Sequence, residues 1–182
     1  LSVIFGANLG TTATGWIVAT IGFKLDLGAL SLPLIAVGGL VAIASERRRL
    51  HHIASVVFGI GLLLMGLDLM KGAVGDIAQT FDIDQLRGYG AVQFLLFGVF
   101  FSAVVQSSSA TMMVTLSALH AGIVDLPSAA AVVIGADLGT TTTLLIGSVK
   151  GSAAKKRVAA GHLLFNVVTD AIAFIFRIPL LG

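Results

Sequence analysis

Residues 88–124 read GYGAVQFLLFGVFFSAVVQSSSATMMVTLSALHAGIV and contain no Asp, Glu, Lys or Arg. As one helix these 37 residues would extend about 55 Å, whereas the hydrocarbon core of a bilayer is about 30 Å thick. The segment must therefore tilt steeply, leave the membrane or fold back. Its middle, residues 106–109 (Gln-Ser-Ser-Ser), is its most polar part. Irregular backbone at membrane depth is tolerated where it is buried or lines a cavity, so this polar tip predicts a lined cavity.

The rest of the chain is also too apolar for a soluble protein. Of its 182 residues 57% are hydrophobic and 11% are charged, against about 25% charged in soluble domains. This composition indicates an all-α polytopic membrane protein and excludes an ordinary cytosolic enzyme or a nucleic-acid module. The chain has no Cys, which excludes disulfides and thiolate metal sites. Because it starts at Leu1 with no basic segment ahead of an apolar one, we expect no signal peptide and part of a longer protein.

Charge placement predicts the topology. Apolar spans are expected at residues 1–23, 28–45, 53–70, 126–149 and 158–178. Basic clusters at residues 46–52 and 150–157 should lie on the same, cytoplasmic side of the membrane. They share a side only if residues 91–124 enter and leave on one face, which favours a re-entrant hairpin. The alternative is a long tilted helix whose serines bond their own i−4 carbonyls.

A nine-residue motif occurs twice. Residues 6–14 (GANLGTTAT) and 135–143 (GADLGTTTT) are identical at seven positions. In this topology, the first copy runs from inside to outside and the second from outside to inside. Inverted repeats with broken helices are typical of secondary transporters, whose site lies near the bilayer midplane.

The composition of the motif favours a helix break. Its glycines cost about 1 kcal/mol each in a helix, and its threonines can cap a following half-helix. Exposed N–H groups at such an N-terminus attract anions, and freed carbonyl and hydroxyl oxygens suit sodium. The alternative is that Gly and Thr merely let helices approach closely.

These residues resemble the bacterial branch of the type II sodium–phosphate cotransporter family. The resemblance rests on Gln-Ser-Ser-Ser at 106–109, on both motif copies and on residues 162–166 (HLLFN), and it runs through nearly the whole chain. It implies an inverted-repeat transporter that moves inorganic phosphate inward with sodium and carries no covalent chemistry. Sodium is then the coupling ion, no organic cofactor is expected, and the chain is a multi-pass protein of the inner membrane.

The resemblance also implies which residues line the substrate and ion site. From the hairpin and the two copies these are Gln106, Ser107, Ser108, Ser109, Asn8, Thr11, Thr12, Asp137, Thr140 and Thr141, with Asn166 as a polar support. Sodium would bind through Gln106, Ser108, Asp137 and Thr140. Two departures matter. The hairpin of the first repeat is absent from this chain, so it should hold about half a site, and Asp137 replaces the usual Asn.

Three parts follow from this interpretation. They are residues 1–52 (the second part of repeat 1), 53–90 (a connecting span and outer loop) and 91–182 (repeat 2, with a hairpin at 91–124, a broken helix at 126–149 and a final span at 158–178). Whether two chains form a homodimer that pairs their hairpins stays open.

Other functions were weighed against transport. Ser, His and Asp are all present, but no Gly-x-Ser-x-Gly elbow occurs, so a hydrolase is disfavoured. The alternative from another class is a membrane-embedded scaffold or sensor that binds an anion without moving it. Asp170 lies in the last span and is expected to pair with a neighbour such as Asn166.

Overall fold

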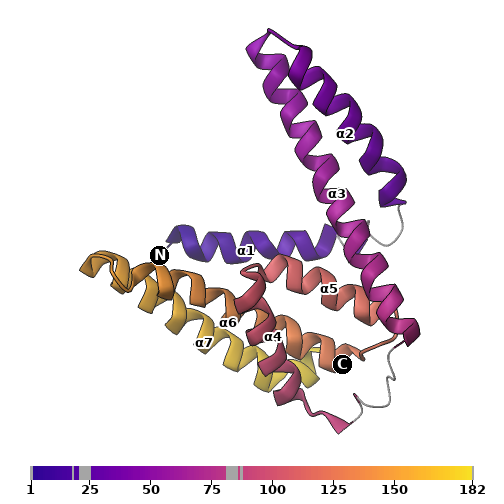
Figure 1. The fold of residues 1–182 in the computed structure, drawn as a ribbon. Coiled ribbons are helices and arrows are strands. Elements are labelled where there is room, and N and C mark those ends of the chain that lie inside the picture. Colours follow the sequence, from indigo (N-terminus) through magenta and orange to yellow (C-terminus); the bar gives the residue numbers. More distant parts are fainter. Residues whose placement is uncertain (1, 18, 21–25, 81–85, 87, 182) are drawn as a thin grey trace. The chain divides into compact units, whose positions relative to one another are not determined.

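The structure is a computed structural model that describes residues 2–17, 19–20, 26–80, 86 and 88–181. Its helices are α1 (Ser2–Ile17), α2 (Leu27–Ala44), α3 (Arg48–Thr80), α4 (Ala91–Val105), α5 (Ser108–His120), α6 (Leu126–Ser148) and α7 (Ala153–Leu181) (Figure 1). Four of them, α2, α3, α6 and α7, are long and apolar enough to cross a bilayer. The predicted all-α membrane protein is thereby confirmed. The end of the predicted span 1–23 and most of the outer loop before residue 90 lie outside the described residues.

The chain divides into two compact units. One consists of Leu1–Trp16 with Val74–Gly182, and the other of Ile17–Ala73. The boundary falls inside α3. All the residues predicted for the functional site belong to the first unit.

The second unit is an antiparallel pair formed by α2 and the first part of α3. Asp26 caps α2 by accepting a hydrogen bond from the Ala29 N–H (2.9 Å). A Cβ at Gly38 would overlap the backbone of Phe58, so this glycine lets the two helices approach backbone to backbone. The connection between them is the first basic cluster, at residues 45–47 and the start of α3.

The uncharged run 88–124 forms two helices, not one. Gln106 adopts a left-handed conformation (φ 56°) and ends α4, and Ser107 caps α5 by accepting a hydrogen bond from the Ala110 N–H (3.2 Å). Helices of 15 and 13 residues extend about 22 and 20 Å, less than the thickness of a bilayer core. The long tilted helix considered above is therefore wrong.

Helix α4 packs on α6 through glycines. An added Cβ at Gly98 would overlap the Val132 carbonyl, at Gly135 the Leu95 carbonyl, and at Gly139 the Val99 carbonyl and the Ser102 side chain. Gly135 lies against Leu95 and Val99, and Gly139, one turn later, lies against Val99, Ser102 and Ala103, so α4 and α6 run in the same direction. Helix α7 returns antiparallel to α6 after a short turn at residues 149–152.

The predicted broken helices are not observed. Helices α1 and α6 continue without interruption through both motif copies. The reason is that the threonine hydroxyls bond carbonyls of their own helix instead of capping a new one: Thr140 bonds the Asp137 carbonyl at 2.8 Å and Thr141 the Leu138 carbonyl at 2.7 Å. In the second copy, the alternative that its small residues allow close helix packing is the one the structure supports.

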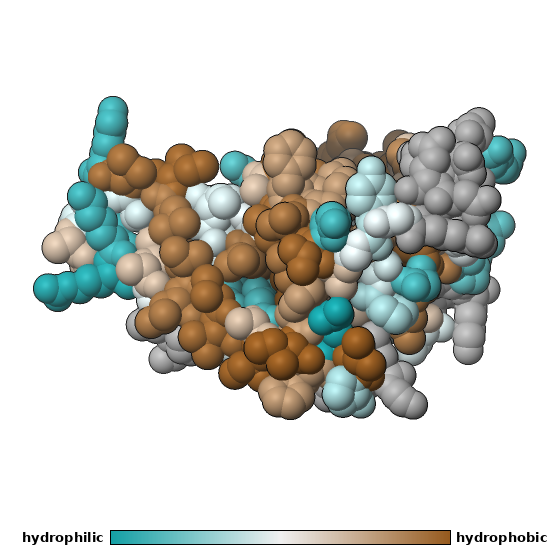
Figure 2. Space-filling view, turned by 90° about the horizontal axis from the view of Figure 1, so that it is seen from below, coloured by the Kyte–Doolittle hydropathy of each residue, from teal (hydrophilic) through white to brown (hydrophobic). Residues whose placement is uncertain are grey.

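Many large apolar side chains are exposed, as expected for helices that face lipid. Figure 2 shows brown side chains over much of the visible face, with hydrophilic ones among them, and long hydrophilic side chains at its left end, where Figure 1 places the turn between α6 and α7. That turn carries the second basic cluster.

Candidate functional site

The hairpin tip places four polar residues within one turn of chain. Gln106 is exposed, while Ser107, Ser108 and Ser109 are half-buried at the start of α5. Besides capping α5 with its hydroxyl, Ser107 accepts a hydrogen bond at its carbonyl from the Thr111 hydroxyl (3.0 Å). The hydrogen bonds that the structure shows at the tip are therefore local. They fix the turn and do not involve the side chains of Ser108 and Ser109.

The two motif copies meet at Asn166. The Asn8 side-chain amide donates to Asn166 Oδ1 (2.9 Å), and Asn166 Nδ2 donates to the backbone carbonyl of Asp137 (3.2 Å). Asn8 and Asp137 are the third residues of the two copies, and Asn166 is completely buried between them. The predicted polar support is thus a bridge that joins the same position of both repeats.

The remaining predicted residues line the two helices on either side of this bridge. On α1, Thr11 is half-buried and Thr12 exposed, and they bond the carbonyls of Ala7 (3.0 Å) and Asn8 (3.4 Å). On α6, Thr140 is half-buried and Thr141 buried. Each hydroxyl donates its hydrogen within the helix, so its oxygen lone pairs can still accept or coordinate.

Helix α4 connects the hairpin to the second copy. Ser102 lies one turn before Gln106 and rests against Gly139. Its hydroxyl is buried and has no hydrogen-bond partner. The structure thus brings the arm of the hairpin onto the motif, but it shows no hydrogen bond between residues 106–109 and the Asn8–Asn166–Asp137 bridge.

Sequence reasoning gave too little weight to one stripe on α7. His162, Asn166 and Asp170 are spaced by four residues and share one helix face. Asp137 lies close enough to interact electrostatically with both His162 and Asp170. The expected pairing of Asp170 with Asn166 is not observed, because the Asn166 amide bonds Asn8 and Asp137, and Asp170 Oδ2 is buried without a partner. The signal in the sequence was that three polar residues recur at every fourth position of an otherwise apolar helix.

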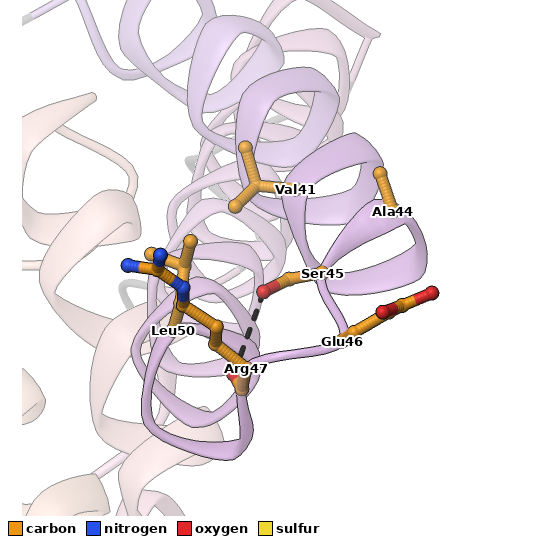
Figure 3. Close-up of a pocket in the computed structure, with 6 residues that line it drawn as sticks. All are labelled: Val41, Ala44, Ser45, Glu46, Arg47 and Leu50. Atoms are coloured by element: carbon orange, nitrogen blue, oxygen red, sulfur yellow. Dashed lines mark hydrogen bonds between the residues drawn. The ribbon is translucent and has the colours of Figure 1, made fainter.

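Two surface hollows are lined by other residues. One is at the turn between α2 and α3, where Ser45 donates to the Arg47 carbonyl (3.4 Å), the Glu46 side chain points away and the Arg47 side chain extends to the side of Leu50 (Figure 3). The other lies at the starts of α4 and α6, against Tyr89 and Asp125. Among the described residues, no group of three or more His, Cys, Asp or Glu side chains is arranged to hold a metal ion.

Comparison with known proteins identifies the family. A family model described as Na+/Pi-cotransporter matches residues 1–72 and 89–178. The chain is 31% identical over 184 residues to a Salmonella typhimurium protein named "Putative inorganic phosphate export protein YjbB", covering 99% of this chain and 33% of that protein. The Escherichia coli K12 protein of the same name is 31% identical over 179 residues, 97% of this chain and 32% of its own length.

A third relative carries no functional name. The Bacillus subtilis "Uncharacterized protein YqeW" is 27% identical over 179 residues, 97% of this chain and 56% of the relative. No solved structure matches the chain. The chain spans about a third of the length of the YjbB relatives. Because the family model covers most of its residues, the chain belongs to the Na+/Pi-cotransporter family.

Proposed function

We propose that this chain is part of a secondary transporter that moves inorganic phosphate across the inner membrane, coupled to sodium. One observation carries the proposal: in a chain matched by the Na+/Pi-cotransporter model, two copies of a polar motif meet at one buried residue, Asn166. Polar and ionisable residues inside a membrane bundle are rare and often mark a substrate or ion pathway, and Asp137 contributes to this contact.

The helix directions support an inverted repeat. In Figure 1, α1 runs from the N-terminal label toward the right, whereas α6 runs the other way, to the turn from which α7 leads back to the C-terminal label. The two motif copies therefore run in opposite directions, as inverted repeats require.

The packing of α4 on α6 supports the re-entrant hairpin. Because these two helices run parallel, the chain must return between them, and α5 is the helix that lies between them in sequence. Both arms are too short to span a bilayer, so a dip that enters and leaves on one face fits their lengths. With such a dip, α3 and α6 would be the two crossings between the basic clusters, which agrees with both clusters lying on one side.

In the proposed site, hydrogen-bond donors at the hairpin tip bind phosphate, and oxygen atoms at and near the tip bind sodium. The N-terminus of α5 presents backbone N–H groups and the positive end of its dipole, beside the hydroxyls of Ser108 and Ser109, to phosphate oxygens. Sodium would bind oxygen ligands from Gln106, Ser108, Asp137 and Thr140. The half-buried carboxylate of Asp137 supplies the negative charge that favours a cation there. Sodium bound first would offset the cost of desolvating the anion.

The direction of transport follows from the gradients in this proposal. The family resemblance implies inward movement, and the relatives' name refers to export. A symporter has no fixed direction, because phosphate moves with the net driving force of both species.

The test is phosphate flux by the full-length protein in proteoliposomes. Radiolabelled phosphate is placed inside or outside, with an inward, outward or absent sodium gradient. We expect flux that follows the sodium gradient in both arrangements. Flux that ignores sodium would refute the coupling, and phosphate binding without flux would support the scaffold or sensor instead.

A matched pair of serine variants tests the site. Ser108→Ala removes a hydroxyl from the hairpin tip and should lower flux about tenfold or more, since a hydrogen bond to a charged group contributes about 1.5–3 kcal/mol. Ser55→Ala removes an exposed hydroxyl on α3 that bonds its own helix, and should leave flux unchanged. Equal flux in wild type and Ser108→Ala would refute the assignment of the tip.

A further inference from the structure

Asn166 imposes different requirements on the equivalent residues of the two repeats. At Asp137 it contacts the backbone carbonyl, which can only accept a hydrogen bond. The nitrogen of the Asn166 amide must therefore face α6, and its oxygen must face α1. This orientation follows from hydrogen-bond chemistry and does not depend on telling nitrogen from oxygen in the side chain.

The residue at position 8 must then be a donor. The Asn8 amide donates to Asn166 Oδ1 at 2.9 Å. An ionised carboxylate in its place would set two acceptor oxygens against each other in a buried setting, which is strongly unfavourable. The Asn166 amide cannot turn to correct this, because its oxygen would then face the Asp137 carbonyl.

Position 137 has no such requirement. Its contribution to the bridge is a main-chain oxygen, which is the same for Asn and Asp. The side chain there can be a carboxylate or an amide without changing the bridge. This accounts for the main difference between the copies, Asn8 in the first and Asp137 in the second.

We propose that Asn166 is a positioning residue that holds the first repeat in register on the second, and that this role requires a hydrogen-bond donor at position 8 but not at position 137. Two observations indicate what the bridge contributes to α1. The glycines Gly6 and Gly10 have no atom within 4 Å of the position a Cβ would take, and Gly15 lies against the flexible side chain of Met112. The bridge is therefore one attachment of the first copy that is made by fixed hydrogen bonds. The inference on register does not depend on transport; only its consequence for flux rests on the proposed function.

The first experiment uses hydrogen–deuterium exchange on the full-length protein in nanodiscs at neutral pH. Asn8→Asp and Asn166→Leu should each raise exchange in peptides from residues 2–17 about tenfold, the cost of a lost buried hydrogen bond. Asp137→Asn replaces a carboxylate by an amide at the equivalent position of the second copy, and it should not raise exchange in residues 2–17. The double variant Asn8→Asp with Asn166→Leu should exchange in residues 2–17 no faster than the faster single variant, because both changes remove the same Asn8–Asn166 hydrogen bond.

The second experiment separates positioning from general loss of stability. The thermal midpoint of Asn8→Asp should fall below wild type at neutral pH and approach it at about pH 5, because a protonated carboxyl has an O–H that can donate to Asn166 Oδ1. Asn166→Leu should show the same deficit at both pH values. In a flux assay, Asn8→Asp should likewise recover part of its activity at the lower pH.

The proposal is overturned if Asn8→Asp exchanges like wild type in residues 2–17, if Asp137→Asn loosens α1 as much as Asn8→Asp does, or if the thermal deficit of Asn8→Asp is independent of pH. A wild-type protein that moves no phosphate would instead refute the proposed function, and the exchange and thermal results would still decide this one.

Discussion

Residues 6–14 and 135–143 share seven of nine amino acids, but their surroundings differ. In the second copy, Gly135 and Gly139 lie against the backbone of α4, and a Cβ at either would overlap it. In the first copy, Gly6 and Gly10 have no atom within 4 Å of a Cβ position. The side chain of Leu9 is 76% exposed, whereas the equivalent Leu138 is half-buried.

This difference in surroundings indicates that the motif permits close helix packing but does not enforce it. The same small residues form a continuous helix in both copies, whether or not another helix lies against them. What buries the second copy is α4, the first arm of the hairpin. In the part of the chain that the structure describes, no atom lies within 4 Å of a Cβ position at Gly6 or Gly10 of α1.

Replacing a glycine at a helix contact by a larger residue should have the largest effect on the free energy of unfolding. Gly135→Leu should lower the free energy of unfolding by about 3 kcal/mol, the upper end of overpacking costs, because α4 has no side chain there that can move aside. Gly6→Leu should leave it unchanged or raise it by up to about 1 kcal/mol in the 182-residue chain, because Gly6 meets no neighbour and Leu has the higher helix propensity. Denaturant titration of the purified chain in detergent measures both. Equal losses would show that the faces of α1 and α6 are equally covered and would remove the contrast.

Threonines at equivalent positions should differ less. Thr141 is 2% exposed and bonds the Leu138 carbonyl at 2.7 Å, whereas its counterpart Thr12 is exposed and bonds the Asn8 carbonyl at 3.4 Å. We expect Thr141→Val to cost about 1 kcal/mol and Thr12→Val to be nearly neutral, in the same titration. If Thr12→Val costs as much, the first copy is more enclosed than its exposure indicates.

The smallest effect concerns the start of the helix that carries the second copy. The Ser128 side chain and N–H hold the pKa of the Asp125 carboxyl below its usual range, and the N–H lies 2.9 Å from Asp125 Oδ1. A lowered pKa means that the cap stabilises the fold above the unfolded-state pKa and that this contribution is lost as the pH falls through the folded-state pKa. Asp125→Ala should cost about 1 kcal/mol or less at neutral pH.

Asp125→Asn provides the control for this cap. Asn caps a helix about as well as Asp but does not titrate in this range. Its stability should match wild type at neutral pH and lose the acid-dependent part of the decline. An identical acid decline in wild type and Asp125→Asn would assign that decline to other carboxyl groups.

Most helix positions could be predicted from charge placement alone. The runs 28–45 and 126–149 correspond to α2 and α6 within one residue at each end, because charged or capping residues bound them. The run 53–70 underestimates α3, since its helix continues through Asp68 and Lys71. The division of 88–124 at residues 106–107 follows the polar tip, where Gln106 adopts a conformation that other non-glycine residues of the described chain do not.

The site was predicted as a set of residues but not as an arrangement. The motif's Gly and Thr are compatible with both a break and a continuous helix, and the hydrogen bonds that decide between them depend on tertiary packing. The hydrogen bond between Asn8 and Asn166 joins residues that are 158 positions apart, so no local sequence pattern could predict it. The division into repeats 1–52 and 91–182 and the pairing of two chains remain predictions.

Backbone-to-backbone contact between α4 and α6 also has a mechanical consequence. Where side chains separate two helices, the helices can shear by changing rotamers, but the nearest atoms to a Cβ at Gly98 or Gly135 all belong to the main chain. We therefore expect α4 and α6 to move together as one rigid body in any conformational change. Relative movement between helices would then occur at contacts made by flexible side chains, such as the contact of Met112 with Gly15.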